Sequence, residues 1–306
     1  MDMAGLAPLT WGTAAGTWRL APVTDVALLV AAGLYLRRAR RGWPIGRTSC
    51  FLGALVLLAV TLQSSIDVYG HELFWMHMIE HLLLIMCVPV LFVLGQPIRL
   101  AGDRIRGVSH SRVASVLTFP PLALALYAAV LVGTHLTGFM GLMLTHEWLH
   151  ELEIVLYLGS GYLFFLPLLG HEPLRRQLSY PLRVFLLFLG MTADTVVGVL
   201  LMMTTREPFP TAVLSDIHTG GGIMWVVGDG LMFAVTVLVV AQWMRDTERQ
   251  NDTGQWLESA RRSTLANLGV EAVNQNTDAD IDDDDAALAA YNRMLAKLNQ
   301  RDRGAS

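Results

Sequence analysis

Long apolar runs constrain this chain more than any other feature of its sequence. A helix needs about 20 apolar residues to cross the hydrocarbon core of a bilayer. Runs of this kind occur at residues 20–36, 48–66, 75–94, 115–134, 150–169, 183–203 and 223–244. Charged residues make up 16% of the chain, compared with about 25% in soluble domains. The sequence therefore predicts an all-α, polytopic membrane protein with seven transmembrane helices.

The arginines predict how these helices are oriented. Most of them fall between alternate pairs of spans, at Arg37, Arg38, Arg40, Arg41, Arg47, Arg99, Arg104, Arg106, Arg112, Arg175, Arg176 and Arg183. The opposite side carries Arg19 and Arg206. Because basic loops stay in the cytoplasm, we expect the N-terminus outside and the C-terminus in the cytoplasm.

The composition changes near residue 245. This predicts a seven-helix transmembrane domain over residues 1–244 and a cytoplasmic acidic tail over residues 245–306. An Asp-rich run at 277–285 lacks the Gly and Glu of a calcium loop, so we interpret it as a solvated linker. After it, apolar residues recur at helical spacing, which predicts a terminal amphipathic helix with a stripe of Leu288, Tyr291, Leu295 and Leu298.

Other features exclude several classes of protein. The chain has two cysteines, Cys50 and Cys87, without paired spacing. A disulfide framework or a thiolate zinc site is therefore not expected. The net charge is -4 and the sequence contains no basic recognition helix, so we expect no nucleic-acid partner.

Histidines gather on one predicted side of the membrane. Seven of the nine fall at or near the outer ends of the spans: His71, His77, His81, His135, His146, His150 and His218. Two pairs, His77 with His81 and His146 with His150, have i,i+4 spacing. On a helix, such rings lie on one stripe about 6 Å apart along the axis, which suits two ligands of one metal ion. A single histidine near the membrane interface can equally be an amphipathic side chain that anchors a helix there. The pair His146 and His150 could also belong to a polar loop.

Carboxylates and methionines accompany these histidines. The acids Glu80, Glu147, Glu151 and Glu153 are candidate ligands or acceptors that fix imidazole tautomers. Methionines occur nearby, at Met76, Met78, Met140, Met143 and Met224. Imidazole with thioether suits copper, especially Cu(I), although methionine is also a common gap filler in apolar cores.

Polar groups also occur deeper in the predicted spans. Asp194 and Asp229 must face the interior of the bundle, because an exposed carboxylate in lipid is costly. Each is either a metal ligand or hydrogen-bonded to a Thr or His of another helix. Ahead of the last span, three consecutive glycines at 220–222 permit a tight turn or a close approach of helices.

Several of these stretches are similar to one family. MHMIEHLLLIMCVPVLFVLGQPIRL (76–100), THLTGFM (134–140), HEWLHELE (146–153) and LSDIHTGGGIMWVVGDG (214–230) resemble the polytopic CtaG family of cytochrome c oxidase assembly factors. The ending AALAAYNRMLAKL (286–298) is similar to actinobacterial members. The resemblance implies a seven-helix protein of the plasma (inner) membrane that helps deliver copper to haem-copper oxidase.

The resemblance also implies which positions are functional. The polar motifs of the family match His77, His81, His146, His150 and Asp216 with its glycines. Many relatives have a Gln-Gln or similar pair where this chain has Ile217 and His218, which makes His218 an additional candidate ligand or a departure from the family pattern.

The predicted function is therefore a copper-handling assembly factor, not an enzyme, that helps metallate cytochrome c oxidase. The expected cofactor is copper as Cu(I), and the candidate ligands are His77, His81, His146, His150, His218, Glu80, Asp194 and Asp229. Expected partners are oxidase subunits, membrane lipid and a periplasmic copper donor.

Three alternatives stay open at this point. One is an intramembrane zinc-dependent hydrolase of the seven-span type, with Glu80 or Asp194 as the base. Another is a haem-binding membrane cytochrome with His81 and His150 as axial ligands. The third is a scaffold that binds no metal.

Overall fold

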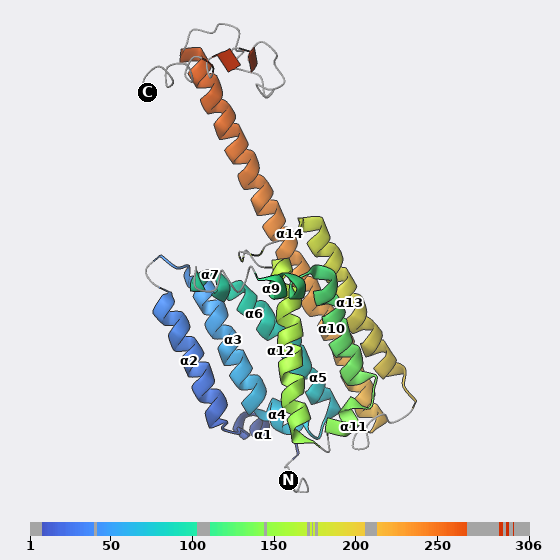
Figure 1. The fold of residues 1–306 in the computed structure, drawn as a ribbon. Helices are drawn as coiled ribbons and strands as arrows, with labels where there is room; N and C mark the ends of the chain where they lie inside the picture. Colours follow the sequence, from blue (N-terminus) through green and yellow to red (C-terminus); the bar gives the residue numbers. More distant parts are fainter. Residues whose placement is uncertain are drawn as a thin grey trace. The chain divides into compact units, whose positions relative to one another are not determined.

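The first of two compact units contains a helical bundle (Figure 1). The computed structural model describes residues 8–39, 42–102, 111–143, 146–169, 172, 174, 177–205, 213–267, 288–289, 292–293 and 296. Within these residues the chain forms helices and no strand. The helices are α1 (Trp11–Gly16), α2 (Pro22–Arg38), α3 (Ile45–Gln63), α4 (Ser65–Gly70), α5 (Phe74–Leu82), the π-helix η1 (Leu83–Cys87), α6 (Val88–Gly95), α7 (Pro97–Ala101), α9 (Arg112–Leu117), α10 (Pro120–His135), α11 (Phe139–Met143), α12 (Glu147–Leu169), α13 (Tyr180–Met203) and α14 (Leu214–Asn267).

Apolar helices of membrane-spanning length confirm the predicted class. Five segments are long and apolar enough to cross a bilayer: Ile45–Gln63, Phe74–Ala101, Trp148–Leu169, Tyr180–Met203 and Leu214–Arg249. Helix α10 is apolar but shorter, and α2 occupies the position of the first predicted span. The protein is thus an all-α, multi-pass membrane protein. The count of seven spans and the orientation of the termini stay predictions.

The two units are residues 1–240 and 241–306. In the second unit, residues 241–267 form the last part of α14. Five residues of the terminal segment are helical, namely Leu288, Ala289, Asn292, Arg293 and Ala296. The rest of the predicted amphipathic stripe and the Asp-rich run lie outside the described residues.

A π-helical turn interrupts the span that carries the first histidine pair. Pro89 explains the change, because it has no N–H for the carbonyl of Ile85 and its ring crowds that carbonyl. The wider turn is closed by the N–H of Val88, which donates to the carbonyl of Leu83. A Cβ at Gly161 of α12 would collide with the Ile85 carbonyl. The missing side chain therefore lets the two spans touch at this turn.

The three consecutive glycines serve close helix packing. A Cβ at Gly221 would lie 2.8 Å from the carbonyl oxygen of Gly198 in α13. A Cβ at Gly220 would press into the ring of Phe74 in α5. These two contacts confirm the close approach of helices that the glycines predicted. They place α14 directly against α5 and α13.

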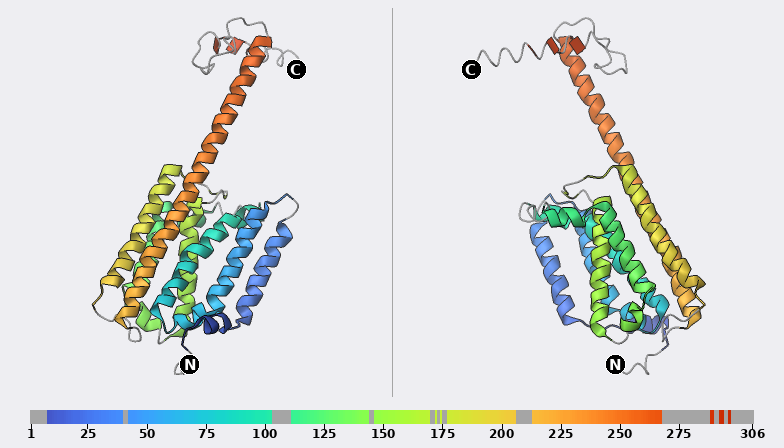
Figure 2. Two further views of the ribbon diagram at one scale, coloured as in Figure 1. Left: turned by 180° about the vertical axis from the view of Figure 1, so that it is seen from behind. Right: turned by 45° about the vertical axis from the view of Figure 1, so that its right-hand side comes forward.

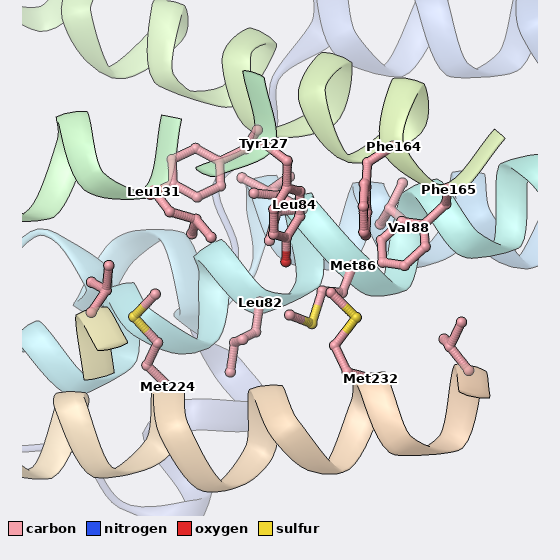
Figure 3. Packing of buried hydrophobic residues seen from close by; sticks show 14 of the residues in the cluster. Leu82, Leu84, Met86, Val88, Tyr127, Leu131, Phe164, Phe165, Met224 and Met232 are labelled. Atoms are coloured by element: carbon pink, nitrogen blue, oxygen red, sulfur yellow. The ribbon is translucent and has the colours of Figure 1, made fainter. Parts of the chain in front are cut away.

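Apolar side chains fill the space between the central helices. Figure 3 shows Met224 and Met232 of α14 directed toward Leu82 and Met86. The same cluster includes Tyr127 from α10 and aromatic and aliphatic residues from α12, among them Tyr157, Phe164, Phe165 and Leu168. Figures 1 and 2 show α2 beside α3 and α13 beside the first part of α14. The core therefore fixes α5, α10 and α12 relative to one another.

Gly161→Ala should lower the free energy of unfolding by about 1–3 kcal/mol, because overpacking forces the spans apart. Gly159 on the same helix is a matched control, since a Cβ there meets nothing within 4 Å. Gly159→Ala should be neutral or slightly stabilising, because Ala favours a helix over Gly by about 1 kcal/mol. Thermal unfolding of both variants in detergent measures the difference. Equal effects would contradict the close contact at Gly161.

Candidate metal centre

Helix α5 is held at its N-terminus by a carboxylate from another helix. The backbone N–H of Phe74 donates to Oδ2 of Asp216 at 2.7 Å, and the N–H of Trp75 donates to Oδ1 at 3.2 Å. A negative charge at this end also complements the helix dipole. Asp216 therefore helps to fix the helix that presents His77 and His81.

His77, His81 and Glu153, here called the deep cluster, bring α5 and α12 together. Oε1 of Glu153 lies 3.3 Å from Nε2 of His81, and Oε2 lies 3.7 Å from Nε2 of His77. The two imidazoles lie on one face of α5, as the i,i+4 spacing predicts, and their centroids are 4.0 Å apart, closer than the predicted separation. One ligand atom of each residue lies within 4.8 Å of the others, and all three residues are buried.

The facing atoms of the deep cluster are not satisfied by hydrogen bonds. Nε2 of His77, Nε2 of His81 and both carboxylate oxygens of Glu153 are buried without a partner among the described residues. Leaving a buried polar atom unpaired costs about 1–3 kcal/mol, and more for a charged group. A cation placed between these atoms would satisfy them together. Two imidazoles and one carboxylate form a donor set that suits zinc or copper.

A chain of hydrogen bonds behind His81 determines which of its nitrogens faces the cluster. The carbonyl of Leu131 can only accept, so the Nδ1–H of His135 donates to it at 2.9 Å. With both rings neutral, Nε2 of His135 then accepts from the Nδ1–H of His81 at 3.1 Å. This leaves the lone pair on Nε2 of His81 toward Glu153. Tyr157 stacks on His81 with ring centroids 4.3 Å apart.

A second group, here called the shallow cluster, consists of Asp67, His71 and His150. Their ligand atoms also lie within 4.8 Å of one another. Oδ1 of Asp67 is 3.7 Å from Nε2 of His150 and 4.0 Å from Nε2 of His71. Asp67 belongs to α4, whose first turn is capped by the hydroxyl of Ser64. Burial and the neighbouring ring of His150 lower the pKa of His71, which favours the neutral form that binds metals.

Two side chains join the clusters. Oε2 of Glu80 lies 3.6 Å from Nδ1 of His77, while its Oε1 lies 3.9 Å from Nε2 of His150. On its other side, Nδ1 of His150 lies 3.7 Å from Oε2 of Glu153. The two clusters therefore form one continuous group of imidazoles and carboxylates at one end of the bundle.

The structure brings together four of the predicted ligands, namely His77, His81, His150 and Glu80. Neither cluster includes His146 or His218. His146 is exposed at the residue before α12, with Nδ1 3.3 Å from the carbonyl of Leu142. The Nε2–H of His218 donates to the carbonyl of Thr204 at 2.9 Å.

The two acids deeper in the spans are engaged elsewhere. Asp194 accepts from the hydroxyl of Tyr127 at 2.9 Å. Asp229 accepts from the hydroxyl of Thr195 on α13 at 3.0 Å. This is the hydrogen bond to a Thr of another helix that the sequence allowed as the alternative to metal binding. Both hydrogen bonds join neighbouring helices of the bundle.

The sequence made Glu153 a candidate ligand or acceptor and placed His71 and His135 among the outer histidines, but none of these three entered the predicted ligand set, and Asp67 was not singled out. Spacing signals were present for Glu153, Asp67 and His71. Glu153 follows His150 at i+3, as Glu80 follows His77, and Asp67 and His71 have i,i+4 spacing. Each spacing places the two side chains on one helix face. His135 carries no such signal, because its partner His81 lies on another helix.

A comparison with models of known families identifies one family for this chain. The model of the cytochrome c oxidase caa3 assembly factor family (Caa3_CtaG) matches residues 27–246. Uncharacterized proteins of Mycobacterium bovis and Mycobacterium tuberculosis are each 31% identical over 302 residues, covering 90% of this chain and 42% of the relative. An uncharacterized protein of Mycobacterium leprae is 30% identical over 297 residues, covering 89% and 42%. The chain thus spans about two fifths of the length of these relatives. No solved structure matches the chain.

Proposed function

Because this chain belongs to the family of cytochrome c oxidase caa3 assembly factors, we propose that it binds copper and helps to metallate cytochrome c oxidase. It is a multi-pass protein of the plasma membrane, and membership of an assembly-factor family indicates a non-catalytic role. Copper is the cargo in this proposal. The proposed partners are oxidase subunits in the same membrane and a periplasmic copper donor.

The observation that carries the proposal is the set of unpaired donors in the deep cluster. His77 and His81 direct Nε2 toward the carboxylate of Glu153, and the side chains of all three are at most 4% exposed. Imidazole is a good ligand for copper, and Cu²⁺ binds such sites more tightly than the other divalent first-row metals. Burial keeps the bound ion out of water, so the ion does not need a full hydration shell while it is held.

The donors differ from the predicted mixture of imidazole and thioether. Met78, Met140 and Met224 are packed in the apolar core, and carboxylates stand beside the histidines. Carboxylate oxygen suits harder ions than thioether sulfur does, so Glu153 and Glu80 allow the site to accept Cu(II) as well as Cu(I). We propose that the ion is held and transferred as Cu(I), with no change of oxidation state, since Cu(I) tolerates a low coordination number while ligands exchange.

Two alternatives give contrasting expectations for the metal. A pair of imidazoles with one carboxylate is also a zinc donor set, so zinc in the purified protein would favour the hydrolase. A haem between His81 and His150 is disfavoured, because the carboxylate of Glu153 lies between them, 3.3 Å from the first ring and 3.7 Å from the second.

Substituting His77 and His81 with Ala should lower copper affinity by roughly 100-fold or more. Loss of a residue that only supports a metal ligand typically lowers metal affinity by about 10–100-fold, and loss of the ligand itself should cost more. Affinity is measured in detergent by titrating Cu(I), and separately Cu(II), against a competing chelator. In cells, the wild-type gene should restore oxidase activity to a deletion strain and the double variant should not.

The role of the carboxylate is tested with Glu153→Gln. Glu172→Gln serves as its control. Glu172 is also buried, but it accepts from the backbone N–H groups of Ile98 and Arg99 beyond the other end of α12. Glu153→Gln should weaken copper binding and Glu172→Gln should not. Wild-type affinity in the His77/His81 double variant would remove the deep cluster from the proposal.

His135→Phe should weaken copper binding by roughly 10–100-fold, the usual effect of losing a residue that orients a ligand. The Phe ring fills the space but cannot accept from the Nδ1–H of His81. His135→Gln offers an amide oxygen as acceptor and should retain most of the affinity. Thermal unfolding without copper separates a loss of folding from a loss of orientation. Equal affinities for the Phe variant and the wild type would exclude this positioning role.

A further inference from the structure

We propose that the shallow cluster of Asp67, His71 and His150 is a second copper site, through which the ion reaches the deep cluster. This inference rests on the proposed function and extends it, since it assigns a separate site and a route to the same cargo. It is carried by the donor geometry, by an unpaired carboxylate oxygen beside the cluster and by a gradient of exposure.

The geometry provides three donors from two places in the chain. Asp67 belongs to α4 and His71 directly follows that helix, while His150 lies in the first turn of α12. The rings of His71 and His150 lie 4.9 Å apart in an edge-to-face arrangement. Their Nε2 atoms both lie within 4.0 Å of Oδ1 of Asp67. A cation at this point would meet two imidazoles and one carboxylate, the same donor set as in the deep cluster.

A buried carboxylate oxygen supplies the second observation. Oε1 of Glu80 has no hydrogen-bond partner among the described residues, although the Glu80 side chain is only 2% exposed. It lies 3.9 Å from Nε2 of His150, and neither nitrogen of that ring has a hydrogen bond within the described part of the chain. Oε1 of Glu80 and Nε2 of His150 therefore face one another without a hydrogen bond, and a cation beside them would satisfy both atoms.

Exposure falls steadily from one cluster to the other. The side chain of His71 is 32% exposed, those of His150 and Asp67 are 13% and 11%, and those of the deep cluster are at most 4%. An ion that binds first at His71 would therefore still be in contact with water. The deep cluster has no comparable exposed member.

His150 provides the step between the sites. Its Nε2 faces Asp67 of the shallow cluster, and its Nδ1 faces Glu153 of the deep cluster. One ring thus offers a nitrogen to each site, and the ion exchanges Nε2 for Nδ1 of His150 as it moves from the shallow to the deep cluster. Glu80 lies alongside this step, so a carboxylate is close to the cation at each stage. The ion would not have to cross an uncharged apolar region, where its desolvation would be most costly.

The test is copper stoichiometry and loading rate with Cu(II) as the probe. The full-length wild type should bind two ions per chain in equilibrium dialysis, and the Asp67→Asn/His71→Ala variant should bind one. The affinity for the remaining ion should match that of the deep site. Its loading should slow by roughly tenfold or more, because the ion then reaches the deep cluster without the help of Asp67 and His71. The His77→Ala/His81→Ala variant should keep the shallow ion only.

Asp25→Asn is the matched control. Asp25 is a carboxylate in the first turn of α2 and accepts from the Gln63 amide at 2.7 Å. This change should leave two ions bound and the loading rate unaltered. Thermal unfolding of each variant without copper identifies any that fails to fold, and Asp67→Asn alone, the milder change, then replaces the double variant.

The outcomes separate this inference from the proposed function. One ion in the wild type, with stoichiometry and loading unchanged in the Asp67/His71 variant, overturns the second site and leaves copper handling intact. Loss of a second ion without slower loading overturns the route. Absence of any bound copper in the wild type overturns both proposals.

Discussion

Glu153 places a carboxylate in the interior of a transmembrane bundle, where it faces two imidazole nitrogens and accepts no hydrogen bond from the described residues. In a medium of low polarity, such an arrangement is unfavourable unless positive charge lies between the donors. No backbone N–H among the described residues donates to this carboxylate. A cation between the donors would satisfy the carboxylate and both imidazoles together.

The fold keeps these donors facing one another. Asp216 caps α5 from the start of α14, and Gly220 lets α14 lie against Phe74 of the same helix. Further along, the π-helical turn and Gly161 allow the span of α5 to touch α12. These contacts surround the clusters without contributing ligands. They explain why glycines and a capping aspartate accompany the histidines in this sequence.

The helical class, the multi-pass character and the His77/His81 pair could be predicted because they depend on local patterns. Apolar run length predicts spans, and i,i+4 spacing places two rings on one stripe. Glu153 was a candidate by residue type, but its convergence with His77 and His81 could not be predicted, nor could the support from His135. Both depend on which faces of α5, α10 and α12 meet. His146 was misleading for a related reason: α12 begins one residue after it, so its spacing to His150 is not that of a continuous helix. Asp194 and Asp229 have the residue type of ligands, but their neighbours are hydroxyl donors.

X-ray absorption spectroscopy of the copper-loaded, full-length protein tests the deep cluster most directly. In the Asp67→Asn/His71→Ala variant, where the one remaining ion occupies the deep cluster, the spectrum should show copper bound by imidazole nitrogen and carboxylate oxygen, and this signal should be lost when His77 and His81 are also replaced. A copper site dominated by methionine sulfur, or an imidazole signal that survives the added substitutions, would contradict the account.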